Sequence, residues 1–118
     1  MSVFFRRRGE PPATTIAVTI TGKGNASYCY AKINGTKQYS AGTHEVNAGD
    51  TITFGVYGNV RDHGYVEIDG TQVLKATGSA TKTYNWTVPD GISTVEIAMN
   101  YRSVGSQPIF GRITVTTA

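Results

Sequence analysis

Apolar residues stand at every second position through most of the chain. In the stretch TIAVTIT, Ile16, Val18 and Ile20 alternate with alanine and threonine, which is typical of a strand with one buried and one solvent-facing side. No stretch carries apolar residues at the spacing of an amphipathic helix. The alternation therefore predicts an all-β fold with little or no helix.

Turn signals separate the alternating stretches about every ten residues, a spacing typical of a sandwich or a small barrel. The pairs Asn34-Gly35 and Asp69-Gly70 favour the positive φ of two-residue hairpins, so each is expected to join two neighbouring antiparallel strands. We predict strands over 14–21, 27–33, 36–40, 43–46, 51–57, 64–69, 71–77, 81–88, 93–101 and 109–117.

The apolar phase of each stretch identifies the expected core. Because the connections are short, the strands should form antiparallel sheets folded over one another, with the alternating faces inward. An immunoglobulin-like β-sandwich is the leading architecture. Its predicted core comprises Ile16, Val18, Ile52, Phe54, Trp86, Val95, Ile97, Ile113 and Val115.

The opening MSVFFRRRGEPP differs from the rest of the chain. It holds two phenylalanines and three arginines without strand periodicity, and Pro11-Pro12 prevents ladder pairing where it ends. A chain of 118 residues suits one domain. We therefore expect an extended N-terminal docking arm over 1–12 and a sandwich domain over 13–118, and we predict that the arm docks through Phe4, Phe5, Arg6, Arg7 and Arg8.

Charge and cysteine content exclude several classes of protein. Three arginines against one glutamate give the first twelve residues a net charge of +2, which leaves only +1 of the total of +3 for the domain. A domain so nearly neutral lacks the basic face of a nucleic-acid binder. Cys29 is the single cysteine, so no internal disulfide can form, and we expect it to be buried and unreactive. Neither a signal peptide nor a membrane span is expected.

Candidate catalytic and metal-binding groups are sparse. Glu67 and Asp69 lie on the polar side of one predicted strand, about 7 Å apart from the strand rise, a separation compatible with inverting sugar hydrolysis. A hairpin role for Asp69 is the stronger interpretation. His44 and His63 lack partners at metal-ligand spacing, and no serine lies in a nucleophile-elbow pattern. We predict a protein that is not an enzyme and that uses no cofactor and no metal.

Surface aromatics give the clearest binding signal within the domain. If Cys29 and its aliphatic neighbours face the core, Tyr28 and Tyr30 face outward, and with Tyr39 they could form a platform for sugar rings. The alternative is cross-strand packing of the tyrosines. The polar loop 58–64, with Arg61 and His63, is a second possible recognition surface.

The opening MSVFFRRRGEPP resembles the short Phe-Arg-rich openings of small virion structural proteins of phages and prophages. The stretches VTITGKGNASYCYAKINGT, HEVNAGDTITFGVYGN and KTYNWTVPDGISTVEIAMNY resemble Ig-like domains carried on phage tail and capsid proteins. The resemblance covers nearly the whole chain. It implies attachment to a virion and display on its surface, sometimes with weak binding to host-surface glycans.

The leading hypothesis is thus a virion structural protein, made in the bacterial host cytoplasm and docked by its arm to capsid or tail subunits in a multi-copy assembly. The alternative is a carbohydrate-binding module that uses Tyr28, Tyr30 and Tyr39. An enzyme subunit would require a cleft with convergent carboxylates. No nucleic acid and no membrane insertion is expected in any of these cases.

Overall fold

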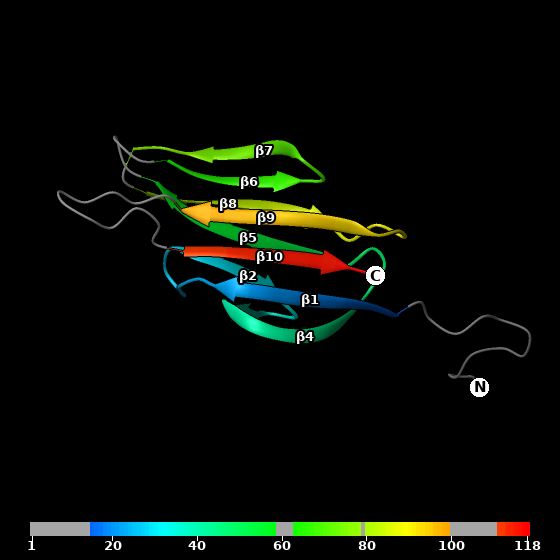
Figure 1. Ribbon diagram of the computed structural model, residues 1–118. Coiled ribbons are helices and arrows are strands. Elements are labelled where there is room, and N and C mark those ends of the chain that lie inside the picture. Colours follow the sequence, from blue (N-terminus) through cyan, green and yellow to red (C-terminus); the bar gives the residue numbers. More distant parts are fainter. Residues whose placement is uncertain (1–14, 59–62, 79, 100–110) are drawn as a thin grey trace, which may run out of the picture.

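The computed structural model describes residues 15–58, 63–78, 80–99 and 111–118, and these residues form strands without any helix. The strands are antiparallel and form two sheets packed face to face, a β-sandwich (Figure 1). In chain order they are β1 (Thr15–Lys23), β2 (Cys29–Ile33), β3 (Thr36–Gln38), β4 (Ser40–Asn47), β5 (Thr51–Gly58), β6 (Gly64–Ile68), β7 (Thr71–Ala76), β8 (Ala80–Thr87), β9 (Ser93–Met99) and β10 (Gly111–Thr117).

The two sheets differ in width. The six-stranded sheet has the order β4-β1-β10-β9-β6-β7, and the four-stranded sheet has the order β3-β2-β5-β8. The first and last strands, β1 and β10, are neighbours inside the larger sheet, with Ile20 opposite Val115. Within the described residues, β4 and β7 are thus the edges of one sheet, and β3 and β8 are the edges of the other.

Both predicted two-residue hairpins are present. Asn34 and Gly35 have φ angles of 52° and 82° between β2 and β3, and Asp69 and Gly70 have 50° and 85° between β6 and β7. Two consecutive left-handed residues are the hallmark of the type I′ turn, whose twist matches that of the flanking strands. These turns fix the register of the two hairpins.

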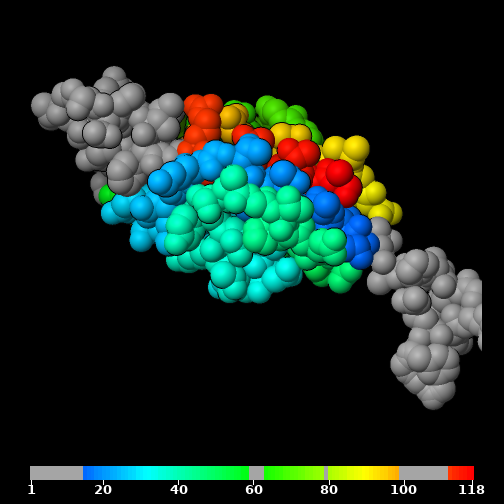
Figure 2. Space-filling view, turned by 60° about the horizontal axis from the view of Figure 1, so that its bottom comes forward, coloured from blue at the N-terminus to red at the C-terminus, as the bar shows by residue number. Residues whose placement is uncertain are grey.

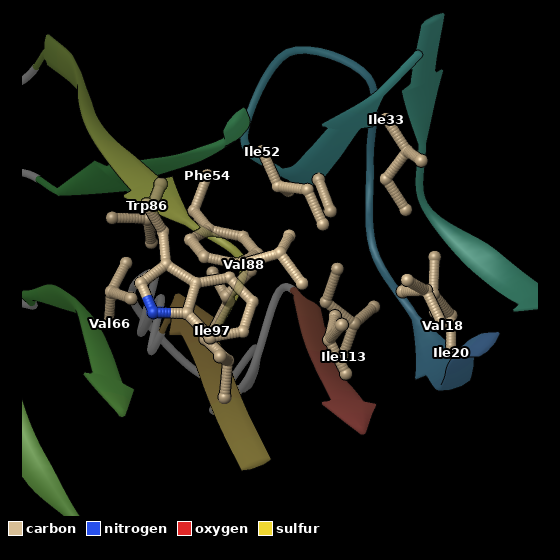
Figure 3. Close-up of a cluster of buried hydrophobic side chains, with 14 of the residues drawn as sticks. Val18, Ile20, Ile33, Ile52, Phe54, Val66, Trp86, Val88, Ile97 and Ile113 are labelled. Atoms are coloured by element: carbon tan, nitrogen blue, oxygen red, sulfur yellow. The ribbon is translucent and has the colours of Figure 1, made fainter. Parts of the chain in front are cut away.

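The core lies between the sheets and is built from the apolar phase of the strands (Figure 3). Phe54 is fully buried, and its ring centroid lies 5.7 Å from that of Trp86 on the neighbouring strand β8. All nine residues of the predicted core are buried. The interior of the sandwich therefore follows from the alternation alone.

Differences from the predicted strands occur at their ends. The strand predicted over 43–46 begins earlier, at Ser40, because β4 continues through Gly42 in register with Ile20. The strand predicted over 36–40 ends at Gln38, because Tyr39 connects β3 in one sheet to β4 in the other. The predicted arm over 1–12 lies outside the described residues.

Phe54→Ala tests the core directly. Removal of a fully buried phenylalanine ring should lower the free energy of unfolding by about 3–5 kcal/mol, measured by chemical denaturation. Thr19→Ala, at an exposed position of β1, is the matched control and should change it by less than about 0.5 kcal/mol. A loss below about 1 kcal/mol for Phe54→Ala would contradict the buried packing.

Candidate interaction surfaces

The start of β1, the C-terminal residue Ala118 and two turns lie at the same end of the sandwich. Ala17, near the start of β1, exchanges main-chain hydrogen bonds of 3.2 and 3.1 Å with Ala118. Val88 accepts the N–H of Gly49 at 2.9 Å and donates its own N–H to Asp50 at 2.8 Å. In Figure 2 the blue start of β1, the red C-terminal residues and the yellow segment before β9 lie together. We call this region the entry end.

The opposite end of the sandwich is where the segments outside the described residues connect to the strands. Gly58 pairs with Ala80, and Met99 pairs with both Gly64 and Gly111, so 59–62, 79 and 100–110 all attach at this far end. His63, predicted as a recognition residue, is half-buried there. Arg61 lies outside the described residues.

Ile92 is the most exposed large apolar side chain among the described residues, at 75% exposure. It lies in the turn between β8 and β9, at the entry end. The alternation in the sequence could not indicate that Ile92 is exposed, because a residue in a turn belongs to neither the inward-facing nor the outward-facing set of a strand. An exposed isoleucine is common on protein surfaces, so Ile92 alone does not define a site.

Tyr30 faces outward from β2 as predicted, yet it is only 7% exposed. Its ring lies across Gly55, its cross-strand neighbour on β5, and a Cβ atom at Gly55 would collide with ring atoms Cζ, Cε2 and Oη of Tyr30. The ammonium group of Lys37 lies 4.5 Å from the ring centroid. Tyr30 is thus covered by its neighbours, and the prediction that it stands exposed is wrong.

The other two tyrosines do not complete a platform. Tyr28 is half-buried against the core and packs edge-on to Tyr57, with ring centroids 4.9 Å apart and planes inclined by 61°. Tyr39 is exposed at 40%, outside the strands. The predicted stacking platform is therefore absent from the described surface, and the alternative interpretation, local packing of tyrosines, applies to Tyr28 and Tyr30.

The contact between Tyr30 and Gly55 can be tested by a double-mutant cycle. Gly55→Ala should destabilise the protein by about 1–3 kcal/mol, because the added methyl group displaces the Tyr30 ring. In a Tyr30→Ala background the same change should cost less than about 1 kcal/mol, because the space is then empty. Equal costs in both backgrounds, measured by urea denaturation, would contradict the stacked arrangement.

The carboxylates considered for sugar hydrolysis have separate structural positions. Asp69 is the first turn residue of its hairpin, and its Oδ1 accepts the N–H of Thr94 at 2.9 Å. Glu67 stands opposite Glu96 on β9. The hairpin role predicted for Asp69 is therefore the observed one, and its carboxylate is already engaged with the main chain.

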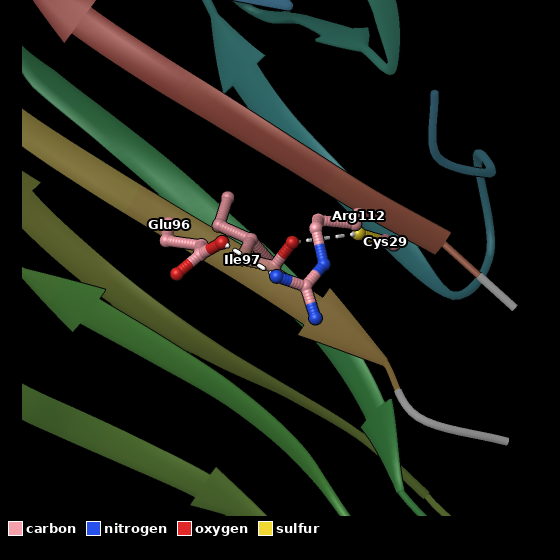
Figure 4. A network of polar contacts seen from close by, with 4 residues as sticks. All are labelled: Cys29, Glu96, Ile97 and Arg112. Carbon is pink, nitrogen blue, oxygen red and sulfur yellow. Dashed lines mark hydrogen bonds and ion pairs between the residues drawn. The ribbon is translucent and has the colours of Figure 1, made fainter. Parts of the chain in front are cut away.

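An ion pair lies on the outer face of the six-stranded sheet (Figure 4). Arg112 Nη1 donates to Glu96 Oε2 at 2.9 Å, and both side chains are partly exposed. Partial burial, followed by the charge of Glu96, raises the pKa of the neighbouring Tyr65. An exposed pair of this kind adds at most about 1 kcal/mol to stability.

Cys29 is fully buried, as predicted, at the start of β2. Its thiol donates to the main-chain oxygen of Ile97 at 3.5 Å (Figure 4). Burial raises the pKa of the thiol from 9.0 to about 12. Since the thiolate is the reactive form, the folded protein protects this cysteine from modification.

Cys29 should therefore react with a thiol reagent at pH 8 only after unfolding in denaturant. The raised pKa also predicts that stability falls as the pH rises from 9.0 towards about 12, because the unfolded chain ionises at Cys29 before the folded protein does. Cys29→Ala should lack this part of the pH dependence in denaturation curves. Rapid labelling of the folded protein would contradict the burial.

The described residues hold no group of three or more His, Cys, Asp or Glu side chains arranged to bind a metal ion. His44, on β4 opposite Val18, is half-buried. In the same part of the chain, no helix is long and apolar enough to cross a membrane. Comparison with protein-family models, curated proteins and solved structures finds no match to this chain.

Proposed function

We propose that this chain is a non-enzymatic structural protein of a phage virion, docked to capsid or tail subunits by residues 1–12 and displaying an Ig-like domain on the particle. The observation that carries the proposal is the separation of the two ends of the sandwich. The N-terminal segment joins β1 at Thr15, at the entry end, whereas 59–62 and 100–110 attach at the far end. Docking at one end would leave the other end directed away from the particle.

The composition of the arm supports a docking role. Burial of one phenylalanine side chain contributes about 1.5–3 kcal/mol, whereas fixing the backbone of one residue costs about 1–2 kcal/mol. Phe4 and Phe5 alone therefore barely offset the ordering of the segment. Arginine–carboxylate pairs formed by Arg6, Arg7 and Arg8 with the partner subunit would supply the remaining free energy.

The arrangement of tyrosines favours this proposal over the carbohydrate-binding alternative. A stacking site needs an exposed aromatic face, and the ring of Tyr30 is covered by Gly55 and Lys37. Any recognition of host-surface glycans by the displayed domain is therefore assigned to the far end, which includes the loop 58–64 with Arg61 and His63.

Deletion of residues 1–10 separates docking from folding. Because every strand within the described residues begins at or after Thr15, the truncated protein should keep the melting temperature of the full chain within about 2 °C. Its incorporation into phage particles, measured by quantitative mass spectrometry of purified virions, should be lost. Phe4→Ala combined with Phe5→Ala should have the same effect.

Arg6→Ala, Arg7→Ala and Arg8→Ala together should weaken docking in a salt-dependent way, because ion pairs are screened by salt. The matched control is the triple change to lysine, which keeps the charge and loses bidentate pairing, and it should be intermediate. If the deletion variant unfolds while its folded fraction still enters particles normally, the arm packs on its own domain and the proposal fails.

A further inference from the structure

The four sheet edges of the described chain differ in how they are protected from pairing with another strand. The edge strand β3 has only three residues. The edge strand β7 pairs with β6 in a register that shifts between Val66 and Glu67 of β6. On β4, the carbonyl oxygen of Glu45 accepts the Asn34 side-chain amide at 3.1 Å. Short strands, irregular registers and covering groups all hinder the addition of a strand.

Within the described residues, the edge strand β8 has none of these three features. Its eight residues pair with β5 in one unbroken register, from Thr51 opposite Thr87 to Gly58 opposite Ala80. It contains no proline and a single charged residue, Lys82. A regular edge of this length is a template for another strand.

The hydrogen bonds of Val88, which directly follows β8, show which main-chain groups of β8 point toward β5 and which point away. Val88 directs both its N–H and its C=O to the turn that precedes β5. Because these groups alternate in direction along a strand, the even-numbered residues of β8 face β5 and the odd-numbered residues face away. Thr81, Thr83, Asn85 and Thr87 therefore present their N–H and C=O groups at the open edge.

We propose that two copies of this chain pair antiparallel through β8, about a two-fold axis at Tyr84. In this register Thr83 of each copy lies opposite Asn85 of the other, and Thr81 lies opposite Thr87. These pairs are the odd-numbered residues whose N–H and C=O groups face outward, so all of those groups find partners. The two four-stranded sheets become one continuous eight-stranded sheet.

The side chains are complementary in the same register. Tyr84, which is half-buried, faces Tyr84 of the second copy in a non-hydrogen-bonded pair, where side chains lie closest. Lys82, which is exposed, lies opposite Trp86 of the second copy, whose indole ring is buried in its own core. The two-fold axis passes through the Tyr84 pair, so that contact forms once, whereas each pair off the axis forms twice.

The exposed face of β8 also selects the partner. In this register Thr83 lies opposite Asn85 and Thr81 lies opposite Thr87 of the second copy, and these polar cross-strand pairs can hydrogen-bond through their side chains. All four side chains are exposed, and a strand with only apolar residues on that face would offer them no such partners. This is why we assign the open edge to a second copy of the chain rather than to an unrelated apolar segment.

The mass of the full-length chain, measured by sedimentation at concentrations up to millimolar, should shift from monomer to dimer. Thr83→Pro removes an outward N–H and should weaken dimerisation about tenfold or more, without unfolding the domain. Thr43→Pro, an exposed threonine with an outward N–H on the β4 edge, is the matched control and should leave dimerisation unchanged. A chain that stays monomeric, or a dimer equally sensitive to both prolines, would overturn the proposal.

Disulfide trapping tests the register. Directly opposed residues of a non-hydrogen-bonded pair have Cα atoms about 4.5 Å apart, within the range for a disulfide. Tyr84→Cys should therefore form a covalent dimer under mild oxidation, whereas Thr83→Cys, which faces Asn85 of the second copy, should do so about tenfold more slowly or less. Equal rates would overturn the register.

The pairing is independent of the proposed docking role. Deletion of residues 1–10 should leave dimerisation intact, whereas Thr83→Pro should leave the arm itself unchanged. Failure of one proposal is therefore distinguishable from failure of the other.

Discussion

The packing of Phe54 and Trp86 between the two sheets is the interaction on which the rest of the structure depends. The chain has a single cysteine, so no internal disulfide joins the sheets, and the described residues hold no metal cluster that could replace one. Apolar burial must therefore hold the sheets together. The turns, the ion pair of Arg112 and the open edge of β8 all keep their geometry only while this interior is intact.

Most of the fold could be predicted from local sequence patterns, because alternation and turn chemistry are both local. Asn34-Gly35 and Asp69-Gly70 specify their hairpins through the φ angles that they tolerate, and strand phase specifies which side chains are buried. The end of β3 was less predictable. Tyr39 has the β propensity of a strand residue, but the chain passes from one sheet to the other there. That crossing depends on the packing of the two sheets and not on local sequence.

The surfaces were harder to predict, because they depend on which strands are neighbours. The alternation in β2 placed Tyr30 on the outer face correctly. Its exposure, however, is decided by Gly55, which is twenty-five positions away in the sequence and lies opposite Tyr30 on the neighbouring strand β5. The same limit applies to β8. Its alternation predicts a strand, whereas its position at the edge of a sheet follows only from the strand order.

The pairing of β1 with β10 has a consequence for how the protein is made. The six-stranded sheet places the first described strand beside the last described one, so the interior of that sheet lacks a strand until β10 has been synthesised. A ribosome adds about 5–20 residues per second and its exit tunnel retains the newest part of the chain. The larger sheet can therefore close only after β10 has left the exit tunnel, and until then the apolar faces of β1 and β9 remain open to chaperones.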